Sequence, residues 1–511
     1  MWDEQCDVLV IGSGAGGMTG AYTAGREGLS TILVESSDRF GGTTAYSGGG
    51  MWFPCSAALK RAGVHEELAD AAEYYKEVVG TRTSPVLQDQ YLTTGRKVID
   101  YLEKDSDLFF VIYPWADYYE RAAKSSRGNR HIVPAPLNAA ILGDLRAKLR
   151  PTLAEEREGE PLADELVGGQ ALIGRFLVAL SKLDCVDLRL NTPLVELIRE
   201  DGRVTGAVVG GKDGPRRIRA RRGVLIAAGG FERNAEMRAR YGVPGHATGA
   251  MAPPGNTGVP IEAAIAIGAD TDLMDQGWWS PGLMRPDGRS TFTIGFNAGI
   301  FVDAQGQRFM NESAPYDRAG RDIIAAMAAG KVNIPFWFVY DDSTGPMPPI
   351  ANFTQPFGNL QDYIDSAILR SADTLPELAE AIGVPAEVLN GTVERFNGFA
   401  AEGIDPDFGR GDEYYDRQFT DDRPPLVALS KAPFHAIAFG LSDLGTKGGL
   451  RTDELAHVLD GAGQVIPGLY AAGNSMAAVS GETYPGGGIP IGSSMVFSFL
   501  AAMDMATAPV A

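Results

Sequence analysis

The chain has 511 residues, of which 44% are apolar, so it is long enough to fill the cores of two or three domains. Lysine and arginine number 45 against 65 aspartates and glutamates; the formal net charge of −20 makes nucleic acid and anionic membrane surfaces poor partners. The three cysteines and five histidines are scattered, which excludes a disulfide framework and predicts free thiols and no metal site.

The first residues carry acidic side chains, at Asp3, Glu4 and Asp7. A secretory signal needs the opposite charge and a longer apolar stretch. No run of the sequence approaches the roughly 18 apolar residues of a spanning helix. We therefore expect a cytoplasmic protein without a transmembrane segment, and peripheral contact with a membrane through a local apolar patch stays open.

A short apolar strand at 8–11 runs into a glycine loop, and this is the most informative motif of the chain. A helix is expected over 18–27, and a second apolar strand, 31–34, ends on an acid. In dinucleotide-binding folds the glycines allow a sharp turn, the approach of backbone N–H groups to a pyrophosphate, and close packing of helix on sheet. The pyrophosphate lies on the helix N-terminus and the acid accepts from the adenosine ribose. The residues assigned to the cofactor by this motif are Gly12, Ser13, Gly14, Ala15, Gly16, Gly17, Glu35 and Ser36.

A second glycine cluster, at 41–50, favours FAD over NAD. Its turn is rich in hydrogen-bond donors, which can surround a diphosphate and reach toward a flavin ring. Near the other end of the chain, Pro490 and Ile491 would aim a helix N-terminus at the pyrimidine edge of the flavin, where negative charge grows on reduction. Asn474 is placed to bond the ribityl chain. The predicted contacts from the cluster are Gly42, Thr43, Thr44, Ser47, Gly48 and Gly49.

The nucleotide-binding pattern is split along the chain. Alternating strands over 186–223 lead to a strand that closes in two alanines and two glycines, and a similar strand recurs at 468–474. These segments add Leu194, Ala228 and Gly229 to the predicted cofactor contacts. We expect an α/β chain in which a discontinuous Rossmann-like FAD-binding domain, 1–277 and 446–511, carries an inserted α+β catalytic cap domain, 278–445.

Spread over both ends of the chain, these motifs resemble the FAD-dependent oxidoreductases that include fumarate reductases and succinate dehydrogenase flavoproteins. Some enzymes of that group tether the flavin through a histidine in the loop after the second strand. The corresponding loop here, 44–48, contains no histidine, which predicts non-covalent FAD. The histidine and arginine pattern that binds dicarboxylates in that group is also missing.

Four segments resemble the 3-ketosteroid Δ1-dehydrogenases, and the resemblance runs along essentially the whole chain. They are 115–119, 311–318, 442–450 and 484–492; the last, Tyr-Pro-Gly-Gly-Gly-Ile-Pro-Ile-Gly, is the most specific. The resemblance implies an oxidoreductase of steroid degradation, and so of lipid metabolism, that removes two hydrogens from C1 and C2 of a 3-ketosteroid. A base takes the C2 proton and flavin N5 takes a hydride from C1.

The resemblance also assigns roles to four residues. Tyr316 is the base, and Tyr118, or alternatively Tyr119, helps it to lose or relay its proton. A carbon next to a ketone becomes acidic only when charge on the carbonyl oxygen is stabilised, and the Tyr484 hydroxyl and the Gly488 N–H form this oxyanion hole. A free phenol has a pKa of about 10, so Tyr316 needs a lowered pKa or a relay.

Other functions fit parts of this pattern. A 3-ketosteroid Δ4-(5α)-dehydrogenase shares the cofactor, the substrate class and a catalytic tyrosine, and a fumarate-reductase-like flavoenzyme shares the fold. A flavin redox sensor would bind FAD without turnover. The sequence holds no nicotinamide motif beyond the one assigned to FAD, so the electron acceptor stays open, and a quinone is the acceptor that the resemblance suggests.

Overall fold

The computed structural model describes residues 1–212, 214–353, 355–420 and 423–507, and the chain forms two compact units. Unit 1 comprises Met1–Val243, Ala252–Gly277 and Gly445–Ala511; unit 2 comprises Pro244–Met251 and Trp278–Leu444. Two of these boundaries lie within a residue of the expected ones. The short segment Pro244–Met251 was expected in the FAD-binding part, but it groups with the insert because the Met251 N–H donates to the Asp443 carbonyl at 2.8 Å.

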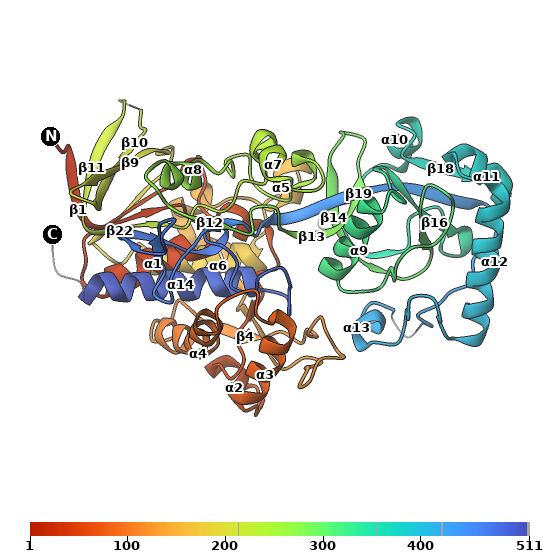
Figure 1. Cartoon of the computed structure of the whole chain (residues 1–511), viewed down its shortest axis with the longest axis horizontal. Helices are drawn as coiled ribbons and strands as arrows, with labels where there is room; N and C mark the ends of the chain where they lie inside the picture. Colours follow the sequence, from red (N-terminus) through yellow and green to blue (C-terminus); the bar gives the residue numbers. More distant parts are fainter. Residues whose placement is uncertain (213, 354, 421–422, 508–511) are drawn as a thin grey trace. The chain divides into compact units, whose positions relative to one another are not determined.

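A mixed sheet, eight-stranded within the described residues, forms the centre of unit 1 (Figure 1). Its order is β21-β22-β11-β1-β2-β8, with β10 and β9 continuing from β11. The N-terminal strand β1 and the late strand β22 both pair in parallel with β11, so the two ends of the sequence meet in one sheet. The strands are β1 (Glu4–Ile11), β2 (Thr31–Val34), β8 (Val186–Arg189), β9 (Leu194–Glu200), β10 (Arg203–Val209), β11 (Arg216–Ile226), β21 (His457–Leu459) and β22 (Val465–Ala471).

Helices and three small sheets complete unit 1. Helix α1 begins at Ala15, three residues before the expected start, because Gly16 and Gly17 already take part in its close packing. It contacts α6 and α14. The helices are α1 (Ala15–Arg26), α2 (Ala57–Arg61), α3 (Leu68–Val79), α4 (Pro85–Leu102), α5 (Leu153–Glu158), α6 (Gly168–Leu180), α7 (Ala235–Tyr241), α8 (Val259–Ala266) and α14 (Ile489–Thr507). The small sheets pair β3 (Met51–Trp52), β5 (His131–Pro134) and β4 (Phe110–Ile112), β6 (Leu137–Asn138) with β7 (Glu165–Leu166), and β12 (Thr271–Asp272) with β20 (Gly449–Leu450).

The C-terminal helix α14 corrects the expectation that no run of the sequence approaches the length and apolar character of a spanning helix. Within the described part of the chain it is the one helix long and apolar enough to cross a membrane by length and composition. Half of its apolar window is buried inside the protein, and the helix contacts α1 and α4. Core helices of globular proteins pass the same test of length and composition.

His457 ties α14 to the edge of the central sheet. Its Nδ1 lies 2.8 Å from Asp453 Oδ2, and its Nε2 lies 3.1 Å from Asp504 Oδ2 on α14. The Tyr470 hydroxyl donates to the same Asp504 oxygen at 2.7 Å. The hydrogen bond to Asp453, followed by the charges of the two carboxylates, raises the pKa of His457 above its ordinary value.

We expect the stability that His457 contributes through Asp453 and Asp504 to be lost as the pH rises. A histidine whose pKa is raised on folding contributes stability that is complete below its unfolded pKa of about 6.5 and is lost as the pH passes through the folded pKa. The Tm of the wild type should therefore fall more steeply from pH 6 to pH 9 than that of His457→Gln. His65→Gln removes an exposed histidine and should follow the wild type. An equal fall of Tm with pH in His457→Gln and in the wild type would contradict this contribution of His457 to stability.

Unit 2 is built on a second sheet, seven-stranded within the described residues, in the order β15-β16-β19-β13-β14-β17, with β18 pairing with β19. Its core is rich in phenylalanine; the ring of Phe301 meets those of Phe338 and Phe439 at centroid distances of 5.0 and 4.9 Å. The strands are β13 (Gly277–Met284), β14 (Ser290–Phe296), β15 (Ile300–Val302), β16 (Phe336–Asp341), β17 (Ile350–Phe353), β18 (Leu369–Ala372) and β19 (Phe434–Thr446). The helices are α9 (Tyr316–Ala328), α10 (Leu360–Asp365), α11 (Leu375–Ile382), α12 (Ala386–Glu402) and α13 (Tyr414–Arg417).

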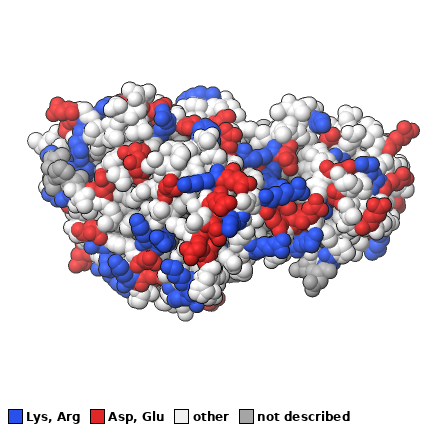
Figure 2. Space-filling model, turned by 60° about the horizontal axis from the view of Figure 1, so that its bottom comes forward, with Lys and Arg blue, Asp and Glu red and all other residues white. Residues whose placement is uncertain are grey.

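Charged side chains of both signs are intermixed on the face shown in Figure 2. Opposite charges also pair directly at the surface: Arg82 pairs with Asp272 at 2.7 Å and with Glu482 at 3.3 Å. Such mixing leaves no separate basic region on this face for a polyanion.

Candidate active site

The loop after β1 has the backbone shape that a bound dinucleotide needs. Gly12 has φ +100°, and a Cβ there would lie 2.4 Å from the Ala227 carbonyl oxygen. A Cβ at Gly17 would lie 1.9 Å from the Gly12 carbonyl oxygen. Gly14 differs, since its φ is −68° and its Cβ would meet only Thr44 Oγ1, at 3.5 Å. The protein's own packing therefore does not require glycine at 14, which leaves a ligand as the reason for the missing side chain.

Glu35 organises the acidic end of β2. Its Oε2 accepts from the Ser13 hydroxyl at 2.6 Å, while its Oε1 accepts from the Ser36 hydroxyl at 3.2 Å and from the Ser37 N–H at 2.9 Å. An ionised carboxylate offers about four lone-pair sites. The Ser37 hydroxyl also donates to Oε1, at 2.9 Å, so these bonds fill the four sites. Glu35 thus holds the glycine loop, and a ribose hydroxyl would take the place of one of the serine hydroxyls.

The second glycine cluster contacts the first. Thr44 Oγ1 accepts from the N–H of Ala15, at the start of α1, at 3.1 Å, and Gly42 opens a 3-10 turn, η1 (Gly42–Tyr46), with φ +51°. The Ser47 hydroxyl donates to the Thr44 carbonyl at 2.7 Å, and a Cβ at Gly48 would meet nothing within 4 Å. The structure thus brings the two clusters together around the N-terminus of α1.

Two further glycines assigned to the cofactor also have a packing reason. A Cβ at Gly16 would lie 2.3 Å from Ser494 Oγ on α14, so this glycine allows α1 and α14 to approach. A Cβ at Gly49 would lie 2.4 Å from the Gly168 carbonyl carbon, and the φ of Gly49 is +67°. Their absence of a side chain is therefore explained by neighbouring protein atoms.

The ends of β11 and β22 are joined by a serine that the sequence motifs did not indicate. Ser475 Oγ accepts from the Ala228 N–H at 3.0 Å and donates to the Gly229 carbonyl at 2.8 Å. Asn474, next to it in η5 (Gly473–Ser475), is half-buried, and its Nδ2 would lie 2.4 Å from a Cβ at Gly445. The remaining predicted contacts lie at the buried start of β9 and in the half-buried first turn of α14: Leu194, Pro490 and Ile491.

A buried carboxylate links several of these segments, and it too was missed from the sequence. Asn256 Nδ2 donates to Glu232 Oε1 at 2.7 Å and to Thr43 Oγ1 at 3.1 Å. Glu232 Oε2 also accepts from the Thr446 N–H at 3.3 Å. The open glycine turns and the fixed hydroxyls around them fit an extended dinucleotide such as FAD.

Gly14→Ala is expected to weaken FAD binding about tenfold or more, that is by at least ~1.4 kcal/mol, because the new methyl group occupies the approach to the backbone N–H groups. The FAD-free protein should keep its Tm, since the methyl group makes only an ordinary contact with Thr44. Titration of the FAD-free protein with FAD measures the effect. Gly398→Ala, where a Cβ meets nothing within 4 Å, is the matched control. Unchanged affinity in Gly14→Ala would show that no phosphate approaches this residue.

Tyr484 and Gly488 lie just before α14 and are linked by a hydrogen bond. The Gly488 N–H donates to the Tyr484 hydroxyl at 3.2 Å. The sequence predicted two donors side by side for one carbonyl oxygen, whereas the structure has them in series, with the N–H directed at the phenol oxygen. Such a chain polarises the phenol and strengthens its own O–H as a donor. Gly488 has φ +88° and its Cβ would lie 2.3 Å from the Gly50 carbonyl oxygen, so another residue would strain this turn.

Tyr118 packs edge-on against Tyr484, with ring centroids 5.3 Å apart and an interplanar angle of 76°. Trp115 Nε1 donates to the Tyr118 hydroxyl at 3.2 Å. The Tyr118 N–H donates to the Pro485 carbonyl at 2.9 Å, while Tyr119 is only half-buried. Of the two adjacent tyrosines, the geometry favours Tyr118 as the partner of the Tyr484 loop.

The segment that carries Tyr118 is anchored by a buried ion pair. Asp117 Oδ2 accepts from Arg130 Nη1 at 2.6 Å, and Oδ1 accepts from Trp52 Nε1 at 2.8 Å. Burial raises the pKa of Asp117 to about 6, although the charge of Arg130 acts in the opposite direction. Arg130 also binds Glu66 through its Nε, at 2.8 Å. No short motif contains these partners, which lie far apart in the sequence.

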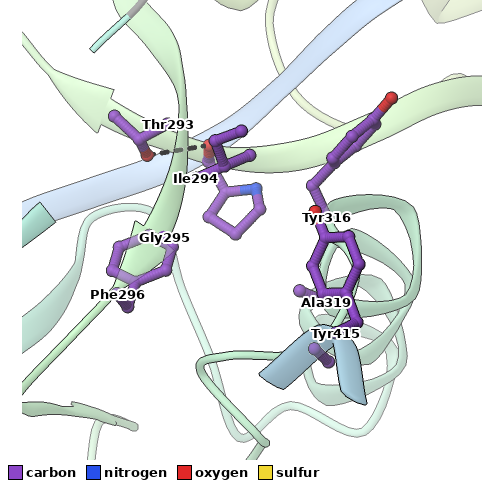
Figure 3. A pocket seen from close by; sticks show the side chains of 9 residues that line it. Thr293, Ile294, Gly295, Phe296, Tyr316, Ala319 and Tyr415 are labelled. Atoms are coloured by element: carbon purple, nitrogen blue, oxygen red, sulfur yellow. Dashed lines mark hydrogen bonds between the residues drawn. The ribbon is translucent and has the colours of Figure 1, made fainter. Parts of the chain in front are cut away.

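Tyr316 belongs to unit 2, where it is the first residue of α9. Its side chain is buried, and its ring meets that of Phe292 edge-on with centroids 4.9 Å apart. It lines a small recess between residues 293–296 of β14 on one side and Ala319 and Tyr415 on the other (Figure 3). The recess is small, and its lining is apolar apart from a few hydroxyl groups.

The loop that leads to Tyr316 is fixed by buried charges. Glu312 accepts from Arg308 Nη2 at 2.7 Å and from Arg410 Nη1 at 3.2 Å. Burial alone would raise the pKa of Glu312, but the two guanidinium groups outweigh it and lower the pKa. The Ser313 hydroxyl donates to the Phe296 carbonyl at 3.2 Å, which joins the loop to the recess.

Comparison with known proteins places this geometry among flavoenzymes. The family model described as FAD binding domain matches residues 7–491. A 3-oxosteroid 1-dehydrogenase of Mycobacterium tuberculosis is 37% identical over 98% of this chain and 98% of its own length. A crystal structure of 3-ketosteroid Δ1-dehydrogenase from Sterolibacterium denitrificans in complex with 1,4-androstadiene-3,17-dione matches with a TM-score of 0.89 and 32% identity, covering 98% of this chain and 99% of that one.

A relative with another substrate is also similar. The 4-oxocyclohexanecarboxylate 2-dehydrogenase of Sinomonas cyclohexanicum is 33% identical over 98% of this chain and 92% of its own length. Both named activities are dehydrogenations next to a ring ketone.

Proposed function

Because this chain belongs to the FAD-dependent 3-ketosteroid Δ1-dehydrogenase family, we propose that it introduces a double bond between C1 and C2 of 3-ketosteroids. The observation that carries this proposal is the hydrogen-bonded pair of Tyr484 and Gly488 at the start of α14. A phenol polarised in this way suits a ketone oxygen that gains negative charge during the reaction.

FAD, held by the glycine loop after β1 and the cluster around η1, supplies the two-electron acceptor for the hydride that leaves C1. Tyr484 donates a hydrogen bond to the C3 carbonyl oxygen, and the Gly488 N–H reinforces that donor. With the carbonyl oxygen stabilised, the C2 proton becomes acidic enough for transfer to the Tyr316 oxygen, once Tyr316 has given up its own proton by ionisation or to a relay. The C2–H bonding electrons then form the C1=C2 bond as the hydride leaves C1. Tyr118 helps Tyr316 to lose or relay its proton.

We further propose that FAD is bound non-covalently and that a quinone reoxidises it. The loop 44–48 lacks a histidine for a covalent link, and the glycine motif after β1 is used for FAD itself. Denaturation should release free FAD into solution. A soluble quinone should restore the oxidised flavin spectrum after reduction, and NAD should not.

A smaller ring ketone is the second candidate substrate. It is supported by the similarity to the 4-oxocyclohexanecarboxylate 2-dehydrogenase, whose named substrate is also a ring ketone and is much smaller than a steroid. A steroid has much more apolar surface to bury than a single-ring ketone. A protein that acts on steroids should therefore bind the steroid more tightly than the smaller ketone.

Anaerobic mixing of the flavoprotein with 4-androstene-3,17-dione tests the proposal. Rapid bleaching of the flavin, with a 1,4-diene product identified by NMR, is the expected result. Bleaching by 4-oxocyclohexanecarboxylate alone would favour the second candidate, and reaction only with 5α-steroids saturated at C4 to give a 4-ene product would indicate a Δ4-(5α)-dehydrogenase. A flavin that dithionite reduces but no ring ketone reduces would contradict both dehydrogenase proposals.

A further inference from the structure

A fully buried lysine lies behind the loop that carries Tyr484. Lys447 follows β19, and its side chain has no solvent exposure. Its Nζ donates to the carbonyl oxygens of Glu482 at 2.6 Å and Thr483 at 2.9 Å, the two residues directly before Tyr484. Removing an ammonium group from water is costly, so its position needs a compensating role.

The backbone around Lys447 is fixed on both sides. Its N–H donates to the Gln276 carbonyl at 2.9 Å, and its carbonyl accepts from the Ala478 N–H at 3.0 Å. The following Gly448 is packed so closely that a Cβ there would lie 2.4 Å from Met274 Cα. Lys447 therefore extends from a rigid base toward the Tyr484 loop.

The loop itself presents its carbonyl groups to this ammonium. The Ser480 hydroxyl donates to the Thr483 carbonyl at 3.0 Å, and the Thr483 hydroxyl donates to the Ser480 carbonyl at 3.0 Å. These reciprocal bonds close a tight turn immediately before Tyr484. The Lys447 bonds to residues 482 and 483 then fix the direction in which the chain enters Tyr484.

The ammonium also brings positive charge near the phenol. Lys447 Nζ lies 6.0 Å from the centroid of the Tyr484 ring. The Glu482 carboxylate forms an exposed pair with Arg82 at 3.3 Å. The Glu482 atom that accepts the hydrogen bond from Lys447 is the backbone carbonyl oxygen. The buried carboxylate of Glu232 accepts from the N–H of Thr446, the residue before Lys447. A cation at this distance from the ring attracts its π-electrons and draws electron density away from the hydroxyl.

We propose that Lys447 is a positioning residue for the dehydrogenation, which directs Tyr484 toward the substrate carbonyl and strengthens its hydroxyl as a donor. The inference rests on the proposed function, because it needs a ketone oxygen bonded to Tyr484. Lys447 acts through Tyr484 and touches no reacting atom. Its loss therefore weakens polarisation of the carbonyl while leaving most of the binding surface in place.

Infrared difference spectroscopy of bound 1,4-androstadiene-3,17-dione tests this role in the FAD-loaded protein. Polarisation by Tyr484 lowers the stretching frequency of the C3 carbonyl. We expect Lys447→Met to raise this frequency toward that of Tyr484→Phe, and the double variant to show no further rise. Single-turnover flavin reduction by 4-androstene-3,17-dione should slow by about tenfold to a hundredfold, less than for loss of an oxyanion donor itself. The affinity for the dienone should change less than about threefold.

Two further variants keep the test decisive if Lys447→Met fails to fold. Lys447→Gln retains a donor without the charge and should raise the carbonyl frequency, whereas Lys447→Arg retains the charge and should keep it near the wild-type value. Glu482→Gln leaves the carbonyl partner in place and is the matched control. A wild-type frequency in Lys447→Met or Lys447→Gln, or additive shifts in the double variant, would overturn the role of Lys447 alone. Absence of a bound-dienone band in the wild type would overturn the proposed function and the role of Lys447 with it.

Discussion

Tyr316→Phe is expected to slow anaerobic flavin reduction by 4-androstene-3,17-dione about 10²–10⁴-fold, the usual contribution of a positioned general base. The substitution removes one hydroxyl and leaves the ring, so the edge-on contact with Phe292 at 4.9 Å stays available. The steroid should still bind, because the substitution leaves the aromatic ring of residue 316 and its contact with Phe292 in place. The loss should therefore appear in the rate of the chemical step measured by stopped flow, with little change in the steroid concentration that gives half-saturation.

Tyr340→Phe is the matched control for this experiment. Tyr340 is also a buried tyrosine of unit 2, and its hydroxyl donates to the Pro346 carbonyl at 2.8 Å. Its loss should cost about 1 kcal/mol of stability and leave the rate of flavin reduction unchanged. If Tyr316→Phe stays within about tenfold of the wild-type rate, a different group must take the C2 proton. A flavin sensor without turnover would instead show no flavin reduction by the steroid in the wild type.

Tyr484→Phe is expected to slow the same step about 10²–10³-fold, the usual cost of one oxyanion-hole donor. The change removes the hydroxyl that accepts from the Gly488 N–H at 3.2 Å. Because that N–H and the phenol form a series, the variant loses the donor to the substrate and also the polarisation that the N–H supplies. Stopped-flow flavin reduction and the carbonyl frequency of the bound dienone should change together.

Tyr91→Phe controls for loss of a buried hydroxyl in unit 1. The Tyr91 hydroxyl donates to the Trp52 carbonyl at 2.8 Å, and this variant should reduce flavin at the wild-type rate. A Tyr484→Phe variant with a wild-type rate, or with a slow rate but an unchanged carbonyl frequency, would exclude Tyr484 as the donor to C3. The first outcome would leave backbone groups to stabilise the carbonyl; the second would give Tyr484 another role.

Local sequence was sufficient for the parts of the fold that depend on neighbours in the chain. The strand at 31–34 was predicted with the bounds that the structure has, and the α/β class with an FAD-binding fold is confirmed. Such elements depend on apolar periodicity and on glycines at turns, and both can be read within about 30 residues. The roles of Tyr316, Tyr118, Tyr484 and Gly488 stay predictions that the variants above test.

The sequence was less informative where one pattern serves two purposes. Gly16 and Gly49 follow the cofactor motif, yet neighbouring atoms explain their missing side chains. The apolar run of α14 was underestimated because proline, glycine and serine interrupt its first turn, although these residues continue a helix once it is packed. A motif records which residues are present, and packing decides what each one contacts.

By itself, then, the sequence determined a glycine loop after an apolar strand, an FAD-binding α/β fold, and the tyrosines that resemble a catalytic set. Only the tertiary structure decided that Tyr118 rather than Tyr119 meets Tyr484, that the Gly488 N–H donates to the Tyr484 hydroxyl, and that Lys447 binds the carbonyl groups before Tyr484. The physical reason is how far apart in the sequence the contacting residues lie. Strands, turns and caps follow from contacts between near neighbours, whereas a hydrogen bond between residues 447 and 482 exists only after the chain has folded and buried Lys447.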